Sequence, residues 1–405
     1  MKAPHPFPYL VTAVAFLVGN LHAQVNSGSN GSDGAFNPTT NVVINMAGHP
    51  DGIYHYTSVN IPSGVTVTFI PNANNTPVVW LVQAGCNIAG LVSVNGGISS
   101  NAPIGALGGP GGYAGGTGAT AGNIAGDGLG PGGGHSGTNG ASGNGSFGTV
   151  GALGNYWCPQ QNAPGPIYGN AYLVPLLGGS GGGGPGGGGG GAILIAASSN
   201  ITVTGQIHAD GGNGFLQTCW NCVLGGGGGG SGGAIRLVST SVTGNGYLSA
   251  GGGSSYVCWY DGVASSVAGL GRVRIDSFSD TFGGSINANF SRGYQPIIIP
   301  QNNQVASLII QSVGGVAVSA TPSGALATPD AVLSAQQNNP IPIVIQCSNL
   351  PLHTPITVTV KPANGLSVTA SGFNSVGTIA SSVATISMVM PRGGGLIHAT
   401  VAASN

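Results

Sequence analysis

The feature that most constrains the fold is a short unit that recurs along the chain, each time beside a glycine-rich segment. The unit reads strand, turn, second strand, glycine turn, short third strand and Gly-Gly, and it begins at Val78, Ala192, Ala234 and, more loosely, Arg272. Units this small cannot bury their own apolar faces, so they are expected to stack on one another. The recurrence predicts an all-β chain with a right-handed parallel β-solenoid over residues 24–298. A β-sandwich of antiparallel hairpins is the competing interpretation.

Glycine-rich segments interrupt these units from about Gly96 to Gly191, Gly211 to Gly233 and Gly251 to Gly271. Glycine supplies 79 of the 405 residues. Flexible linkers are one interpretation, but linkers join domains, whereas these segments recur at one point of the unit. The other interpretation is an extended, polyproline-II-like form in which glycine tracts pack side by side and hydrogen-bond to one another. Both remain open from sequence, and we expect the corner glycines Gly90, Gly205, Gly244 and Gly283 to need a backbone conformation that a Cβ disfavours.

Residues 299–405 differ in character, because glycine becomes rarer and apolar residues alternate regularly with polar ones, as in Ile356–Val360. Such alternation over about 100 residues predicts a small Ig-like or fibronectin-like β-sandwich. The boundary is expected between Pro296 and Gln304.

The N-terminus predicts export. Lys2 precedes an apolar run over residues 9–18, and Ala23 offers a cleavage site before Gln24, so residues 1–23 are expected to be a signal peptide. No later segment is long and apolar enough to span a membrane. Charged residues make up 4% of the chain and the net charge is −1, which excludes an electrostatic footprint for nucleic acid. The predicted location is extracellular or at the cell surface.

Several segments together resemble a known group of proteins. They include Ser29–Pro38, Asp51–Ile61, Gly178–Gly184, Gly191–Ala196 and Ser231–Leu237. Over roughly residues 27–290 the chain resembles uncharacterised secreted glycine-rich bacterial proteins that are predicted to contain a parallel β-helix. The resemblance implies secretion and a solenoid, and it brings no catalytic residues with it.

Cysteine and tryptophan occur together in the glycine-rich segments. The chain has six cysteines, an even number that favours disulfides in an exported protein, and the disulfide candidates are Cys158, Cys219, Cys222 and Cys258. Each lies near a tryptophan: Trp157, Trp220 or Trp259. If the units stack, these segments converge on one side. They would form either an aromatic core closed by disulfides or, with Tyr260 and Asp261, a platform for a sugar ring.

The ionisable residues give little support for catalysis. All eight acidic residues are aspartates, and five of them stand directly before glycine in ordinary turn positions. His49 and His55 bracket Asp51, although histidines with structural partners explain this better than a metal site. We therefore predict no catalytic residue, no metal and no cofactor.

The sequence thus favours a structural or adhesive cell-surface protein without enzymatic activity. The alternatives are a carbohydrate-binding protein and a polysaccharide lyase or hydrolase, the latter because parallel β-helices often carry such sites. The expected partner is a cell-surface or extracellular polysaccharide, and self-association is a further expectation.

Overall fold

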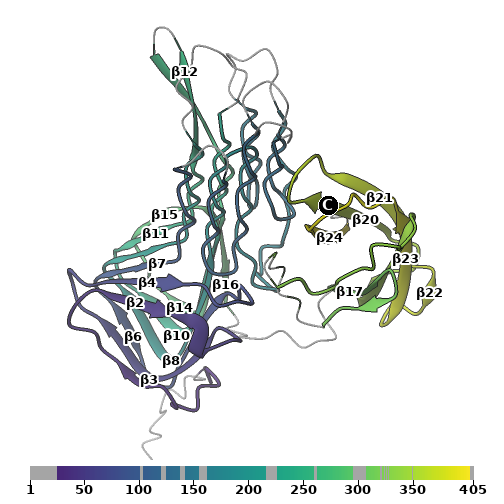
Figure 1. Cartoon of the computed structure of the whole chain (residues 1–405). Coiled ribbons are helices and arrows are strands. Elements are labelled where there is room, and N and C mark those ends of the chain that lie inside the picture. Colours follow the sequence, from purple (N-terminus) through teal and green to yellow (C-terminus); the bar gives the residue numbers. More distant parts are fainter. Residues whose placement is uncertain are drawn as a thin grey trace, which may run out of the picture.

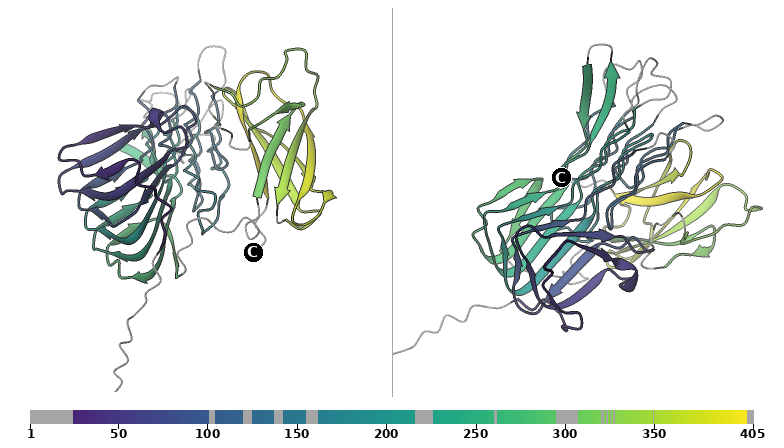
Figure 2. Two further views of the ribbon diagram at one scale, coloured as in Figure 1. Left: turned by 90° about the horizontal axis from the view of Figure 1, so that it is seen from below. Right: turned by 60° about the vertical axis from the view of Figure 1, so that its left-hand side comes forward.

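The computed structural model describes most of the chain and divides it into three parts (Figure 1). Described are residues 25–100, 104–119, 125–136, 142–154, 162–215, 226–259, 262–294, 307–319, 322, 324, 326, 328–348 and 350–401, with the side chains of 256–259 and 262–265 excepted. We name the parts the parallel unit, the glycine bundle and the C-terminal unit. The bundle rises from one end of the parallel unit, and the C-terminal unit lies against the bundle (Figures 1 and 2).

The parallel unit consists of two sheets in which every pair of neighbouring strands is parallel. The first sheet contains β1 (Gly34–Phe36), β3 (Ile53–Ile61), β5 (Val78–Val82), β6 (Cys86–Ile88), β8 (Ala192–Val203), β10 (Ala234–Thr243), β14 (Arg272–Asp280) and β16 (Asn289–Gly293). The second contains β2 (Val42–Asn45), β4 (Thr66–Ile70), β7 (Leu91–Ser93), β9 (Gln206–His208), β11 (Tyr247–Ser249) and β15 (Ser285–Asn287). Apart from β5 and β6, which both lie in the first sheet, successive strands of this unit alternate between the two sheets.

The four recurring segments are hydrogen-bonded neighbours, as predicted. Ala234 pairs with Ala192 on one side and with Arg272 on the other, and Val78 pairs with Ile193. All these pairings are parallel, so an all-β chain with parallel sheets is confirmed, and the antiparallel alternative is wrong for these segments. The pairing of Val78 differs by one residue from the alignment of the repeats, which matched Val78 with Ala192.

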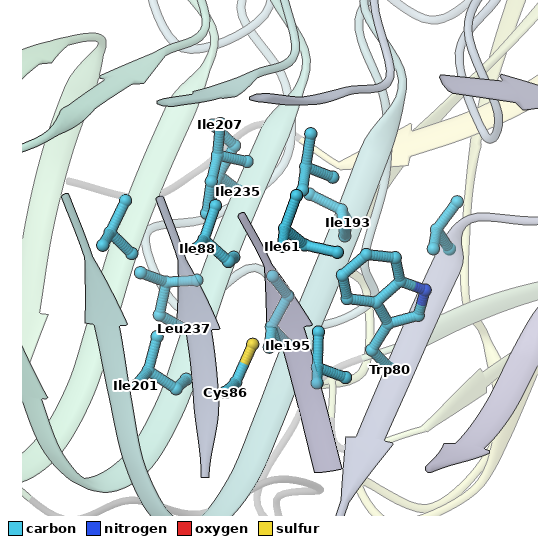
Figure 3. Close-up of a cluster of buried hydrophobic side chains, with 14 of the residues drawn as sticks. Ile61, Trp80, Cys86, Ile88, Ile193, Ile195, Ile201, Ile207, Ile235 and Leu237 are labelled. Carbon is cyan, nitrogen blue, oxygen red and sulfur yellow. The ribbon is translucent and has the colours of Figure 1, made fainter. Parts of the chain in front are cut away.

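Stacking places like residues on top of one another in a shared core between the two sheets. Ile193, Ile195, Ile235 and Leu237 are fully buried there, and Figure 3 shows them in one cluster in which Ile193 and Ile195 lie nearest Trp80. Each side chain points inward because alternate residues of a strand face opposite sides of the sheet. A side chain in this core is covered by the strands before and after it, which is why no single unit needs a core of its own.

The corner glycines follow a different rule from the expected one. Only Gly244 has a positive φ, of 119°. Gly90 and Gly205 are required by close approach instead, because a Cβ would lie 2.2 Å from the Val65 carbonyl oxygen at Gly90 and 2.0 Å from the Gly90 carbonyl oxygen at Gly205. Gly283 has neither constraint, since a Cβ there meets nothing within 4 Å.

The glycine bundle is held by backbone hydrogen bonds with a three-residue period. In the central tract, the N–H groups of Gly181 and Gly184 donate to the tract at 125–130, and those of Gly186 and Gly189 donate to the tract at 112–117. The N–H groups three residues apart thus reach the same neighbour, as they do in a polyproline-II helix with three residues per turn. The expected packing of extended glycine tracts is therefore found, and the linker interpretation is wrong for the described tracts.

These hydrogen bonds connect the tracts into four rows. In order of contact, the first row contains the tracts 94–99, 209–215 and 250–254, and the second row contains 104–109, 185–191, 226–233 and 267–271. The third row contains 112–117, 178–184, 142–148 and 149–154, and the fourth row contains 125–130, 131–136 and 162–166. Each inner tract contacts its neighbours in its own row and in the rows on both sides. Glycine is necessary because the tracts are too close for side chains: a Cβ on Gly233 would lie 1.8 Å from the Gly191 carbonyl oxygen.

The C-terminal unit is formed by two antiparallel sheets around one core. The larger sheet contains β17 (Ser307–Val313), β18 (Val316–Ala317), β19 (Ile341–Ser348), β22 (Val376–Gly377) and β23 (Ser382–Met388), and the smaller one β20 (Pro355–Pro362), β21 (Val368–Phe373) and β24 (Gly395–Val401). Residues 295–306, which contain the predicted boundary, lie outside the described part of the chain.

Candidate functional site

Most of the predicted ligand-binding and disulfide residues fall outside the described residues. These are Trp157, Cys158, Cys219, Trp220, Cys222, Tyr260 and Asp261. Cys258 and Trp259 have a described backbone in β12 (Ser254–Trp259), which pairs antiparallel with β13 (Gly262–Val267), but their side chains are outside the description. Both cysteines with described side chains, Cys86 and Cys347, are buried free thiols. The even number of cysteines therefore does not mean that all six are paired.

The described residues that flank the three Cys- and Trp-bearing segments lie at one end of the bundle, away from the parallel unit. Gly154 N–H donates to the Asn162 carbonyl (2.9 Å) and Gly227 N–H donates to the Phe215 carbonyl (3.2 Å). The β12–β13 hairpin extends from the same end (Figure 1). The segments 155–161, 216–225 and 260–261 therefore leave and rejoin the described chain at a common end of the bundle.

A second cluster joins the bundle to the C-terminal unit. The Asp127 carboxylate, fully buried, accepts hydrogen bonds from Ser136 N–H (2.8 Å), from Ser367 and from His135 Nδ1 (3.1 Å). Burial alone would raise the pKa of Asp127, but the hydrogen bonds from His135, Ser367 and Ser136 outweigh it and lower the pKa to about 2. Asp127 is thus an ionised, fully bonded group, which indicates a structural role.

Lys361 enters the bundle from β20. Its Nζ donates to the carbonyl oxygens of Gly128 (3.1 Å) and Gly133 (3.0 Å), and its pKa falls to about 8 because the side chain is buried, an effect that Asp127 partly opposes. His398 on β24 lies edge-on to Tyr113, and burial together with Lys361 lowers its pKa to about 3. These two charge-assisted hydrogen bonds to glycine carbonyls fix the C-terminal unit to the bundle.

A third cluster contains the residue types of a catalytic triad without its connectivity. His208 Nδ1 lies 3.1 Å from Asp210, but Ser249 Oγ donates to Asp210 Oδ1 (2.5 Å) rather than to the histidine. Burial raises the pKa of Asp210, yet the hydrogen bonds from His208, Ser249 and Gly251 N–H lower it overall. A serine bound to a carboxylate in this way has no histidine base to activate it.

The outer face of the first sheet carries a buried ionic cluster. Asp276 accepts from Arg236 Nη2 (3.1 Å) and from Arg274 Nη2 (2.7 Å), and Arg274 also donates to the Ala171 carbonyl (3.3 Å). Burial lowers the pKa of Arg236, which Asp276 partly opposes. The cluster fastens the segment around Ala171 onto the sheet.

The histidines near Asp51 also have structural partners. His49 Nδ1 lies 2.8 Å from the Ile53 carbonyl oxygen, and His55 Nδ1 accepts the Asn30 N–H (3.3 Å). Asp51 accepts the Ile53 N–H (3.0 Å) as a turn residue. Within the described residues, no group of three or more His, Cys, Asp or Glu side chains is arranged to hold a metal ion.

Sequence reasoning did not single out the junction formed by Asp127, Lys361 and His398. One signal was available: Lys361 is the only lysine after Lys2. A lone lysine at a strand end predicts nothing by itself, because its partners are backbone carbonyls more than 200 residues away along the chain.

Comparisons of the chain with protein-family models, with curated proteins and with solved structures find no match. Among the described residues, no helix has the length and apolar character needed to cross a membrane.

Proposed function

We propose that the chain is a secreted structural or adhesive protein of the cell surface, without catalytic activity. In this proposal residues 24–298 form a right-handed parallel β-solenoid from which the glycine bundle projects, and residues 299–405 form an Ig-like β-sandwich. The alternation of the chain between two stacked parallel sheets supports the first assignment, and two antiparallel sheets around one core support the second.

The glycine bundle is the observation that carries the proposal. Its contacts are backbone hydrogen bonds between glycine tracts, so it has few side chains with which to do chemistry, and it holds a hairpin away from the rest of the molecule. A Cβ at Gly187, Gly212 or Gly233 would lie within 2 Å of a carbonyl oxygen, so the tracts are in direct backbone contact and leave no room for side chains. A stiff, charge-poor projection suits the display of a contact surface at a distance from its base.

The ionisable clusters support a structural protein rather than an enzyme. Asp127 and Lys361 join two parts of the molecule, and Asp276 joins Arg236 to Arg274. Polysaccharide hydrolysis needs two carboxyl groups on either side of a bond, whereas each of these carboxylates is bonded to its own structural partners.

The test uses the producing cells and the mature chain. Antibody labelling of intact cells should find the protein outside them, with an N-terminus at Gln24, and the labelled mature chain should bind cells or their extracellular polysaccharide. Incubation with that polysaccharide, with and without calcium, should release no shorter products. Retention inside the cell, or depolymerisation that requires the protein, would overturn the proposal.

Sugar binding is the second candidate, and the common end of the bundle favours it. Trp157 and Trp220 lie in segments that leave the described chain at that end, and Trp259 lies in the hairpin that extends from it. Aromatic rings suit the apolar faces of pyranoses. A glycan array with the wild type and with Trp220→Ala and Trp259→Ala tests it, with Tyr294→Ala as a control at an exposed aromatic elsewhere. Binding to no glycan, or equal binding by all variants, would end this candidate.

A further inference from the structure

Two opposite edges of the glycine bundle expose aliphatic side chains. The first edge is formed by Ile98, Ile104 and Leu107, whose exposed fractions are 68%, 62% and 76%. They lie on the tracts 94–99 and 104–109, which are the first members of the two rows nearest the parallel unit. Ile104 and Leu107 are three residues apart, so they face the same way on a tract with three residues per turn.

The second edge is formed by Val150, Leu153 and Val267, whose exposed fractions are 59%, 50% and 50%. They lie on the tracts 149–154 and 267–271, which are the last members of their rows. Val150 and Leu153 again stand three residues apart. The bundle is therefore apolar at two opposite edges.

The two edges carry nearly the same sequence. Residues 104–108 read Ile-Gly-Ala-Leu-Gly and residues 150–154 read Val-Gly-Ala-Leu-Gly. Among the described residues, no hydrogen bond uses the backbone N–H of Leu107 or Leu153, as expected for the outward face of a terminal tract. Inside the bundle the corresponding positions must be glycine, because a side chain would strike the next backbone.

We propose that copies of this chain associate head to tail, with the first edge of one copy against the second edge of the next. The two edges share the second row, which begins with 104–109 and ends with 267–271, and the tract 149–154 is hydrogen-bonded to 267–271, so a translation along the second row brings the two edges together. Neither edge carries a charged residue in its described tracts, so no like charges oppose the contact. An interface between two different edges leaves a free edge on each outer copy and produces a filament rather than a closed dimer.

Two features of the bundle support a second copy as the occupant. Stacked repeats normally end in polar caps that prevent further stacking, whereas the second row is aliphatic at both of its ends, at Ile104 and Leu107 and at Val267. The C-terminal unit, which could have covered an edge, contacts the bundle through the tract 112–117 of the third row and through Gly128 and Gly133 of the fourth row, and not through the residues of either edge. Three side chains on each side form less than a standard interface, so we expect weak association that a high local concentration at a surface would favour.

The experiment is sedimentation velocity over a wide concentration range, with the full mature chain. The variants are Ile104→Ser with Leu107→Ser at the first edge and Val150→Ser with Leu153→Ser at the second, and the control is Val332→Ser, an exposed site (71%) on the C-terminal unit. Circular dichroism checks that each variant keeps its β content. Wild type and control should form species that lengthen with concentration, whereas each double variant should associate about 100-fold more weakly through the altered edge.

A mixture of the two double variants gives the sharpest result. Each retains one intact edge, so the mixture should form dimers and nothing longer. A wild type that stays monomeric at all concentrations would overturn the inference, as would assembly by the second-edge variant alone, which would indicate a symmetric contact between two first edges. A monomeric wild type would leave the adhesion proposal to its own test, because that proposal does not depend on filaments.

Discussion

Replacement of one inner glycine of the bundle should be far more damaging than the small size of the change suggests. At Gly187 an added Cβ would lie 1.9 Å from the Gly212 carbonyl oxygen, whereas ordinary contacts begin at 3.4 Å. The two tracts would have to separate by about 1.5 Å. The Gly212 N–H donates to the Gly188 carbonyl across these two tracts (2.8 Å), and this hydrogen bond cannot survive the separation. The Gly187 N–H donates to the Gly228 carbonyl on a third tract (2.9 Å), and a displaced Gly187 loses that bond as well.

The magnitude follows from these contacts. Each lost hydrogen bond contributes about 1 kcal/mol, and each buried partner left without water costs about 1–3 kcal/mol. Gly187→Ala should therefore lower the local free energy of opening by about 3–5 kcal/mol. The matched control is Gly283→Ala, because its Cβ meets nothing within 4 Å, and it should be neutral or stabilise by up to about 1 kcal/mol through the unfolded chain.

Hydrogen exchange with mass spectrometry is the suitable assay, since a chain of several units need not unfold in one step. Peptides from the bundle of Gly187→Ala should lose protection by a factor of at least about 100, while those of Gly283→Ala keep the wild-type rate. Bundle protection in Gly187→Ala within threefold of the control would refute the reasoning that the tracts are in backbone contact.

Three further results are expected. Acid should weaken the junction between the bundle and the C-terminal unit. The pKa of His398 is about 3 in the folded chain and 6.5 in the unfolded chain, so the free energy of unfolding falls as the pH drops from 6.5 to 3. The pKa of Asp127 is about 2 in the folded chain and 3.8 in the unfolded chain, which adds a loss of about 2 kcal/mol below pH 4. Calorimetry at stepped pH checks this, and an unchanged transition between pH 7 and 4 would contradict it. Trp80→Ala should lower the free energy of unfolding, measured with urea, by about 3–5 kcal/mol. Trp80→Phe should lower it much less, because the buried Trp80 Nε1 has no described hydrogen-bond partner to lose. Equal losses for the two variants would argue against this packing. Iodoacetamide should label Cys86 and Cys347 only after denaturation, because both thiols are buried and burial raises the pKa of Cys86 to about 12. Rapid labelling of these two cysteines in the native chain would show that the thiols are accessible and would contradict the prediction.

The pairing of recurring segments could be predicted because it depends on local pattern. Ala192, Ala234 and Arg272 begin segments of similar length and apolar content, and segments that cannot bury their own faces stack in the order in which they occur. The packing of the glycine tracts could be predicted only as one of two interpretations. The sequence shows that side chains are missing, but not whether another backbone occupies the space.

The junction and the corner glycines lay beyond prediction. Lys361 donates hydrogen bonds to the carbonyl oxygens of Gly128 and Gly133, and because every residue has a carbonyl group, the sequence does not show which ones a lysine will bind. Gly90 and Gly205 appeared to need unusual dihedral angles, but the real constraint is the approach of the adjacent pass of the chain. Both depend on which segments become neighbours in space.

By itself, the sequence determined that the chain is built from β-strands and that its charge is too low for nucleic acid, and it favoured a parallel stack of the recurring segments over an antiparallel sandwich. These follow from alternation, repeat length and composition, which act over a few residues at a time. Only the tertiary structure decided which glycines contact which carbonyls, where Lys361 and Asp127 join the parts, and that Leu107 and Leu153 lie exposed at opposite edges of the bundle. The physical reason is that glycine is required where another backbone lies too close for a Cβ, and that neighbouring backbone is usually tens of residues away along the chain.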